Sequence, residues 1–223
     1  MKVELVSYSQ PTEKFKEQGI TDIQELIAFC ARVSNPANQY NTETSEKLIK
    51  YLIANAHWSP LEMVSACAEI ETTRDIARQI LRHRSFAFQE FSQRYADPTK
   101  DLDFVIREAR LQDTKNRQNS VITDDAELQT EWARRQQEVI DIVKGHYTWA
   151  TSMGIAKEQA RVILPEGNTV SRLYMSGSIR SWIHYIEVRA DASTQLEHRI
   201  IAFATAKALT AIFPMADGLT GPN

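Results

Sequence analysis

The densest run of polar side chains in the sequence lies between residues 82 and 95 and has the chemistry of an anion-binding site. Arg82, Arg84 and Arg94 fall within thirteen residues, and the hydroxyl of Ser92 lies among them. Guanidinium groups bind phosphate oxygens through paired N–H donors, and a serine hydroxyl adds another donor. Only Glu90 offers a nearby negative charge in sequence. The segment therefore predicts a site for a phosphorylated ligand, with a solvated charged surface over buried phenylalanines as the alternative.

Two arginines outside this segment are candidates for the same chemistry. In the helix predicted over 178–190, Arg189 falls beside Trp182 at the edge of an apolar face, while Arg180 and His184 share the opposite face. A half-buried arginine needs an anionic or carbonyl-rich ligand unless an internal carboxylate meets it. The alternative is that Arg189 extends its charged end to solvent. Arg161, on a short predicted helix, is the other isolated candidate.

The composition excludes several ways of binding a nucleotide or a polymer. The 223 residues include 26 Lys and Arg against 29 Asp and Glu, a net charge of −3, which argues against bulk binding to nucleic acid or to an anionic membrane. No two of the seven glycines are separated by a single residue, so the chain has neither a G-x-G-x-x-G turn nor a phosphate-binding loop. Any bound nucleotide must be held by side chains and helix ends.

The cysteines and histidines give no pattern of a metal site. Cys30 and Cys67 form no C-x-x-C pair, and the five histidines have no close ligand spacing. We therefore expect no zinc cluster, no disulfide framework and no bound metal. No apolar stretch approaches the ~18 residues of a membrane span, and the acidic, alternating N-terminus is no signal peptide. These features favour a soluble protein in the reducing cytoplasm.

The elements that must position these side chains are mixed helices and strands. The residues predict strands over 2–9, 62–72 and 169–176, an extended or looped segment over 86–95, a short strand over 103–107, and helices over 21–33, 42–56, 73–83, 124–153, 156–164, 178–190 and 194–213. Such an order indicates the α/β or α+β class. We expect a single compact domain over 1–217, with a central, mostly antiparallel sheet flanked by helices, one of them long, and a frayed tail over 218–223.

Several local features are predicted in more detail. The long helix is expected to bury one apolar stripe, in which His146 is a hydrogen-bonded core histidine; the stripe consists of Leu128, Trp132, Val139, Ile142, Val143, His146, Trp149 and Met153. Residues 111–123 are expected to form a mobile polar loop. Thr21 with Gln24, and Thr194 with Glu197, have the spacing of capping boxes.

The spacing of the arginine segment resembles a family motif. Arg82-His83-Arg84, seven residues, Ser92 and Arg94 match the R-H-R-x7-S-x-R motif of flavin-dependent thymidylate synthases. The likeness covers most of the chain apart from residues 96–150. It also includes the segments His57–Glu62 and Ala160–Pro165, Gln79, and the run from Ser178 through Arg189 to Gln195 and Glu197. Within the motif this chain has Ala87 and Gln89 where the family often has Ser and Asn.

The resemblance implies a reaction and its cofactors. Methylenetetrahydrofolate would supply a methylene group to C5 of dUMP, FAD reduced by NADPH would supply the hydride, and a homotetramer would build its active sites at subunit interfaces. Carried over position by position, the dUMP contacts would be Gln79, Arg82, Glu90, Phe91, Ser92, Gln93, Arg94, Arg161 and Arg189. The FAD contacts would be His57, Ser59, Arg82, His83, Arg84, Glu90, Ser178, Arg180 and His184.

The same resemblance assigns Arg189 as the catalytic residue, because a positive charge at the uracil ring stabilises negative charge on N3 and O2. Ordinary thymidylate synthases attack uracil with a cysteine thiolate, whereas neither Cys30 nor Cys67 has a cation nearby in sequence. The alternative function is a single-stranded nucleic-acid-binding module that uses the arginines and phenylalanines of residues 82–95. The net charge of −3 counts against that alternative.

Overall fold

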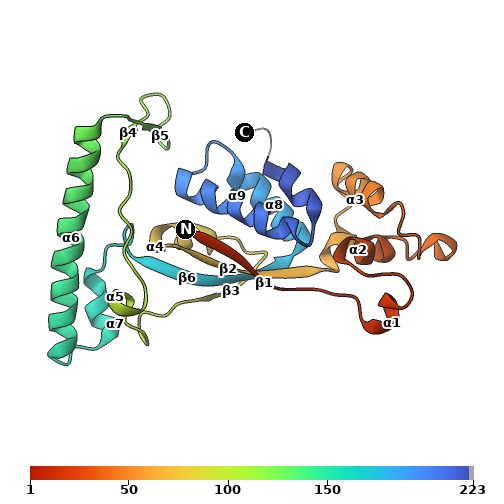
Figure 1. Cartoon of the computed structure of the whole chain (residues 1–223), viewed down its shortest axis with the longest axis horizontal. Coiled ribbons are helices and arrows are strands. Elements are labelled where there is room, and N and C mark those ends of the chain that lie inside the picture. The colour runs from red at the N-terminus through yellow and green to blue at the C-terminus, as the bar shows by residue number, and fades with distance from the viewer. Residues whose placement is uncertain (221–223) are drawn as a thin grey trace.

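A four-stranded antiparallel sheet forms the centre of the molecule (Figure 1). The computed structural model describes residues 1–220, apart from the side chain of Asp217. The strands lie in the order β1-β2-β6-β3 and span Lys2–Tyr8 (β1), Ser65–Thr73 (β2), Val170–Ser178 (β6) and Ala87–Glu90 (β3). Each neighbouring pair is antiparallel. The predicted fold class and sheet are therefore confirmed.

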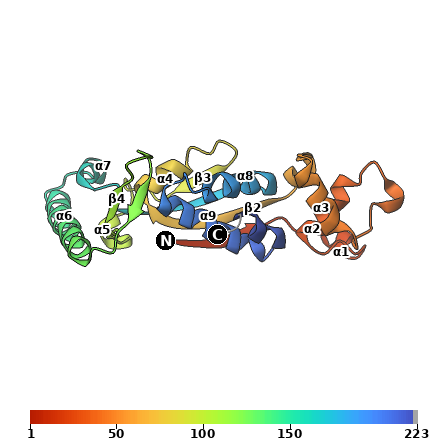
Figure 2. The ribbon, with the colours of Figure 1, turned by 90° about the horizontal axis from the view of Figure 1, so that it is seen from above.

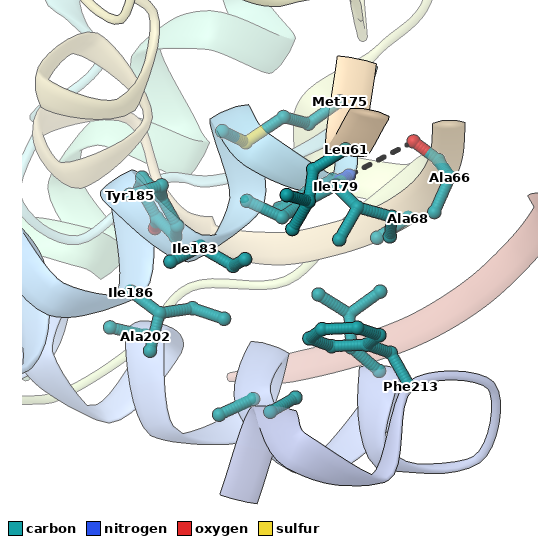
Figure 3. Close-up of a cluster of buried hydrophobic side chains, with 14 of the residues drawn as sticks. Leu61, Ala66, Ala68, Met175, Ile179, Ile183, Tyr185, Ile186, Ala202 and Phe213 are labelled. Carbon is teal, nitrogen blue, oxygen red and sulfur yellow. Dashed lines mark hydrogen bonds between the residues drawn. The ribbon is translucent and has the colours of Figure 1, made fainter. Parts of the chain in front are cut away.

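One face of this sheet carries the main hydrophobic core. Alternate residues of β2, among them Ala68 and Ile70, face the same side as their partners Met175 and Leu173 in β6, and all four are buried. Helices α8 (Ile179–Ala190) and α9 (Leu196–Thr210) cover this face (Figures 1 and 3). Trp182 fastens α8 to the sheet, because its indole Nε1 donates to the carbonyl of Ala66 at 3.0 Å.

The remaining elements extend the molecule at both ends of the sheet (Figures 1 and 2). Helices α2 (Ile23–Ala31) and α3 (Ser45–Ala54) lie at one end, and the long helix α6 (Ala126–Ser152) lies at the other. The other short elements are α1 (Glu13–Lys16), η1 (Pro36–Asn38), η2 (Ser59–Glu62), α4 (Arg74–Ile80), α5 (Pro98–Asp101), α7 (Lys157–Ala160), η3 (Arg161–Ile163) and η4 (Pro214–Thr220). None of the helices within residues 1–220 is long and apolar enough to cross a membrane.

The long helix exists as predicted, but its predicted buried stripe is wrong. Trp132, Ile142, Trp149 and Met153 are 44–67% exposed. The side that packs against the chain instead buries Gln136, Ile140, Tyr147 and Ala150. His146, expected in the core, is exposed. The reason is that α6 stands at the end of the molecule, where a small second hydrophobic cluster around Tyr147 and Leu164, and not the main core, packs against it.

The region 111–123 is also more ordered than predicted. It forms a two-stranded hairpin of β4 (Arg110–Gln112) and β5 (Ser120–Ile122), whose polar turn is held by hydrogen bonds to the Asp113 carboxylate. The strand expected over 103–107 is reduced to an isolated bridge between Phe104 and Thr169. Strands this short carry little of the alternation by which a strand is recognised in sequence.

Both predicted capping boxes are wrong in detail. Helix α2 is capped one residue later than expected, by Asp22 with Glu25. Gln195, not Thr194, precedes α9, and its side chain does not cap the helix. Residues 218–220, expected in a frayed tail, belong to η4, and residues 221–223 lie outside the described residues.

Candidate functional site

The Arg82–Arg84 segment is held by the elements on either side of it. Helix α4 anchors the segment from one side by burying Ile76, Ala77 and Ile80, and it ends before Arg82. The helix predicted over 73–83 is thus shorter, and the residues after Leu81 form a turn. On the other side, β3 pairs with β6, as Ala87 with Ser176 and Glu90 with Leu173. A buried helix on one side and strand pairing on the other therefore fix the turn that carries the arginines.

Phe86 locks this turn onto the sheet. Its ring lies edge-to-face with Trp182 at a centroid distance of 4.7 Å. The same ring lies over Gly177, where an added Cβ would come within 2.5 Å of the Phe86 Cδ1 atom. A glycine is therefore needed at position 177 for the ring to pack this close to the strand. Phe86 and Phe88 pack against the main core, so these rings are not free platforms for stacked bases.

Four arginines near the motif contact carboxylates of the chain itself. Arg74 meets Glu90 at 3.4 Å, and Glu90 also accepts from the Ser171 hydroxyl at 2.7 Å. The three other ion pairs join Arg78 to Glu166, Arg94 to Glu158 at 3.4 Å and Arg180 to Glu62 at 2.7 Å. Apart from Glu90, these carboxylates come from parts of the chain outside residues 82–95, which is why the segment itself showed only Glu90.

The other four predicted arginines have no such partner. Within residues 1–220, no carboxylate forms an ion pair with Arg82, Arg84, Arg161 or Arg189. They come from the turn after α4, from η3 and from α8. An arginine prefers bidentate contact with an anion. These four guanidiniums are therefore available to an external phosphate or carbonyl group.

Arg189 lies against His83 of the motif. The Arg189 Nε donates to the His83 Nε2 at 2.9 Å, so this ring nitrogen is an acceptor. Burial and, to a smaller extent, the nearby charge of Arg189 together lower the pKa of His83 to about 4. His83 is therefore neutral at physiological pH and orients Arg189 without competing with it for an anion.

A first cavity, of about 440 Å³, opens between α4 and the η3 segment. Its lining includes Arg74, Arg78, Gln93 and Arg161. Gln93 is only 4% exposed, and its Nε2 donor has no hydrogen-bond partner in the described part of the chain. Since a buried donor without a partner is costly, this amide and the arginine side chains suit a phosphorylated ligand. The acids Glu158 and Glu166 at the same cavity already form ion pairs with Arg94 and Arg78.

A second cavity, of about 300 Å³, lies beside the N-terminal half of α8. It is lined by Trp58, Glu62, Ser85, Arg180, Ser181, His184 and Glu187. The predicted exposed face of α8 is confirmed here, since Arg180, His184 and Glu187 all border the cavity. Hydrogen bonds from Ser178 and Arg180 lower the pKa of the Glu62 carboxyl, which remains an anion. The cavity is small for a dinucleotide, because even drug-sized ligands fill about 300–1,000 Å³.

Seven of the predicted site residues fall into three groups on one chain. Gln93 and Arg161 border the first cavity, Arg180 and His184 border the second, and Gln79, His83 and Arg189 lie together under α9. Arg82 and Arg84 are exposed in the turn, and Glu90, Phe91, Ser92 and Arg94 continue from β3. His57 contacts Tyr51, with ring centroids 5.9 Å apart, and Ser59 begins η2. Trp58 between them, not either predicted residue, borders the second cavity.

Sequence reasoning missed several polar residues at these places. His198 and Gln195 contact Gln79, and the buried Glu197 contacts Gln195. Glu197 was read as a helix cap. The only available signal was that Gln195 and Glu197 belong to the matched segment after Arg189.

The cysteines lie in surroundings that favour the thiol. Burial raises the pKa of both Cys30 and Cys67, and no cation within residues 1–220 lowers either. Both thiols therefore stay protonated near neutral pH.

The chain is similar to known proteins over most of its length. The family model described as "Thymidylate synthase complementing protein" matches residues 18–215. The chain is 49% identical over 216 residues to the flavin-dependent thymidylate synthase of Synechocystis sp., and 46% identical over 214 residues to a probable flavin-dependent thymidylate synthase of Paramecium bursaria Chlorella virus 1. Each alignment covers 96% of both proteins.

The fold has a counterpart among solved structures. The UMP/dUMP methylase PolB of Streptomyces cacaoi, bound with 5-Br dUMP, superposes with a TM-score of 0.79 over 98% of this chain and 93% of that one, at 23% identity. This likeness supports the fold. Together, the family model and the two relatives show that this chain is an enzyme of the flavin-dependent thymidylate synthase family.

Proposed function

We propose that the protein converts dUMP to dTMP by reductive methylation, with methylenetetrahydrofolate as the carbon donor and NADPH-reduced FAD as the source of hydride. The observation that carries this proposal is the set of four arginines, Arg82, Arg84, Arg161 and Arg189, that no carboxylate of the described chain neutralises. Family membership selects the chemistry, and these arginines supply a place for two phosphorylated ligands.

The dUMP site is assigned to the first cavity, the motif residues and the group around Arg189. Its members are Gln79, Arg82, Glu90, Phe91, Ser92, Gln93, Arg94, Arg161 and Arg189. Arg161 and the unpartnered amide of Gln93 favour a phosphate in the cavity. Ser92 acts as an anion ligand, because its hydroxyl accepts from the Arg94 amide at 3.4 Å and contacts no base within the described residues.

Arg189 is the proposed catalytic residue. Its guanidinium would stabilise the negative charge that develops on N3 and O2 of the uracil, which makes C5 more nucleophilic. The contact with the neutral His83 supports this role, because the histidine holds Arg189 and leaves its charge uncompensated.

The flavin site is assigned to the second cavity and the turn that carries the motif. Its members are His57, Ser59, Arg82, His83, Arg84, Glu90, Ser178, Arg180 and His184. The residues fit the group: Arg82 and Arg84 offer unpaired donors to a pyrophosphate, and the cavity beside Trp58 has apolar and polar walls. FAD, when bound, would supply the hydride. Arg180 donates to the Glu62 carboxylate at 2.7 Å, and the Ser178 hydroxyl holds the same carboxylate by donating to its other oxygen at 2.7 Å.

A homotetramer would complete these sites. Neither cavity is large enough to enclose FAD and dUMP together, and His57 and Ser59 do not border them. The exposed apolar side of α6, with Trp132, Ile142 and Trp149, supports burial against another copy of the chain. The cytoplasmic location stays a prediction, and the alternative of a nucleic-acid-binding module receives no support from the family match.

The direct test is tritium release from C5-labelled dUMP. The purified protein should be yellow from bound flavin and should release tritium only with FAD, NADPH and methylenetetrahydrofolate all present. A colourless protein that takes up no FAD at micromolar concentration contradicts the proposal, as does tritium release that is independent of flavin.

A further inference from the structure

Five polar side chains beneath Arg189 and His83 form a continuous chain of hydrogen bonds. We call it the polar chain; its members are Tyr185, His198, Gln79, Gln195 and Glu197. Tyr185 Oη lies 3.2 Å from His198 Nε2, and His198 Nδ1 lies 3.2 Å from Gln79 Oε1. Gln79 Nε2 donates to Gln195 Oε1 at 2.8 Å, and Gln195 Nε2 donates to Glu197 Oε2 at 2.9 Å. The polar chain joins α8, α9 and α4.

The carboxylate at one end fixes the direction of every bond. Glu197 is 6% exposed and ion-paired with Arg110 at the start of the β4–β5 hairpin, and an ionised carboxylate can only accept. Gln195 must therefore present its N–H groups to Glu197 and its oxygen to Gln79. By the same reasoning, Gln79 donates to Gln195 and turns its oxygen to His198.

The other end of the polar chain completes the pattern. Because the oxygen of Gln79 is an acceptor, the proton of His198 lies on Nδ1, and Nε2 accepts from the Tyr185 hydroxyl. Burial lowers the pKa of His198 to about 3, so the ring stays neutral. His198 and Tyr185 are both fully buried. A complete set of bonds in such surroundings holds one orientation, since any reversal leaves a buried group unpaired.

We propose that His198 is a positioning residue that, together with the Glu197–Gln195 end of the polar chain, holds the Gln79 amide in one orientation for the pyrimidine nucleotide. Gln79 Nε2 uses one N–H on Gln195, and its second N–H has no partner among the described residues. With the oxygen tied to His198, this free N–H is always a donor toward the ligand. The inference rests on the proposed function, since it takes Gln79 to be a dUMP contact.

Two substitutions at position 198 separate this role from a packing role. An asparagine places its amide nitrogen close to the position of Nδ1, whereas a glutamine reaches the position of Nε2. In the FAD-loaded protein, His198→Asn should keep the Kd for dUMP within about twofold. His198→Gln should raise it about fivefold, the effect of losing one hydrogen bond of ~1 kcal/mol. The Tm of both variants is measured alongside. If His198 only packs, the variant with the lower Tm should also be the one with the higher Kd for dUMP.

Thr205→Val is the matched control. Thr205 is also fully buried on α9, and its hydroxyl bonds only the Ile201 carbonyl, at 2.8 Å, outside the polar chain. This variant should lower Tm and leave the dUMP affinity unchanged. An equal loss of affinity in Thr205→Val and His198→Gln would overturn the proposal.

A double-mutant cycle identifies the residue through which His198 acts. In a Gln79→Leu background, His198→Gln should change the Kd for dUMP by less than about twofold, because the contact is already lost. If Gln79→Leu weakens dUMP binding and His198→Gln does not, the positioning role is wrong while the proposed function stands. If native protein binds dUMP and Gln79→Leu binds it equally well, the placement of Gln79 is wrong, and the positioning role with it. A native protein that binds no dUMP contradicts the proposed function itself.

Discussion

The arginines of helix α6 form ion pairs with carboxylates of the chain, whereas four arginines of the candidate site do not. On α6, Arg134 contacts Glu131 and Glu138, and Arg135 contacts Glu131 at 2.8 Å, although all of these side chains are well exposed. The bond from Arg134 lowers the pKa of Glu131 to about 2. At the candidate site, Arg82, Arg84, Arg161 and Arg189 meet no carboxylate within residues 1–220.

Net charge and the number of arginines therefore do not predict where a chain binds an anion. The chain is almost neutral overall, yet its charges are matched in one region and unmatched in another. Exposed ion pairs such as those of α6 contribute little to stability. Unmatched arginines drawn from three separate segments are costly to gather unless a ligand neutralises them.

The largest effect is expected for Arg189→Ala. Removing the charge beside the uracil should lower the rate of dTMP formation at least about a hundredfold, as for other groups that stabilise developing charge. Flavin absorbance and circular dichroism should be unchanged, because Arg189 forms no ion pair in the described chain. Full turnover in this variant would show that Arg189 has no catalytic role.

A smaller effect is expected for Arg161→Ala at the candidate site. Arg134→Ala on helix α6 is the matched control. Loss of one charge-assisted contact to phosphate, about 1.5–3 kcal/mol, should raise the Kd for dUMP roughly ten- to hundredfold. Arg134→Ala, which breaks only exposed pairs, should change neither this Kd nor Tm appreciably. Calorimetric titration with dUMP measures the Kd of both variants. Equal Kd values for Arg161→Ala and Arg134→Ala would show that Arg161 does not bind the phosphate.

The histidines of the two regions should differ in their response to pH. The pKa of the buried His198 is about 3 against 6.5 when unfolded, so the unfolded state binds the proton first and stability falls as pH drops below 6.5. Between pH 7 and pH 5 this group should remove about 2 kcal/mol from the free energy of unfolding. Denaturant unfolding at both pH values should show this loss reduced in His198→Asn and retained in His146→Asn, whose histidine is exposed on α6. The same loss in all three proteins would refute the assignment.

The smallest effect is expected for the double variant Cys30→Ala and Cys67→Ala. Both thiols are held in the protonated form by burial, and neither borders the two cavities. Turnover should stay within about twofold of native at a temperature where the variant remains folded. Abolished turnover in a folded, flavin-loaded variant would identify an overlooked cysteine nucleophile.

Much of the fold was predictable because its elements lie in the main core. In β2 the alternation of Ala66, Ala68 and Ile70 marks the buried face correctly, and in α8 Trp182 and Ile186 mark the helix face that packs on it. Periodicity is reliable where a single core receives one face of each element.

The same rule failed at α6, and the reason is physical. Trp132, Ile142 and Trp149 have the spacing of a core stripe, but the face that packs against this chain is the one with Gln136 and Tyr147. Apolar spacing shows that a face avoids water and does not show what covers it. The 110–122 hairpin was missed for a different reason, because its strands are three residues long.

The sequence alone determined the family motif, the absence of a glycine-rich nucleotide turn and the side chains able to bind anions. These features follow from residue type and spacing, which can be read without a structure. Only the tertiary structure decided which arginines stay unmatched, because Glu90, Glu158 and Glu166 reach Arg74, Arg94 and Arg78 from elsewhere in the fold. It also decided that Glu197 orients Gln79 through Gln195. Ion pairs and hydrogen bonds depend on distance in space. Folding brings residues together that lie far apart in the sequence, so these partners cannot be read from the sequence alone.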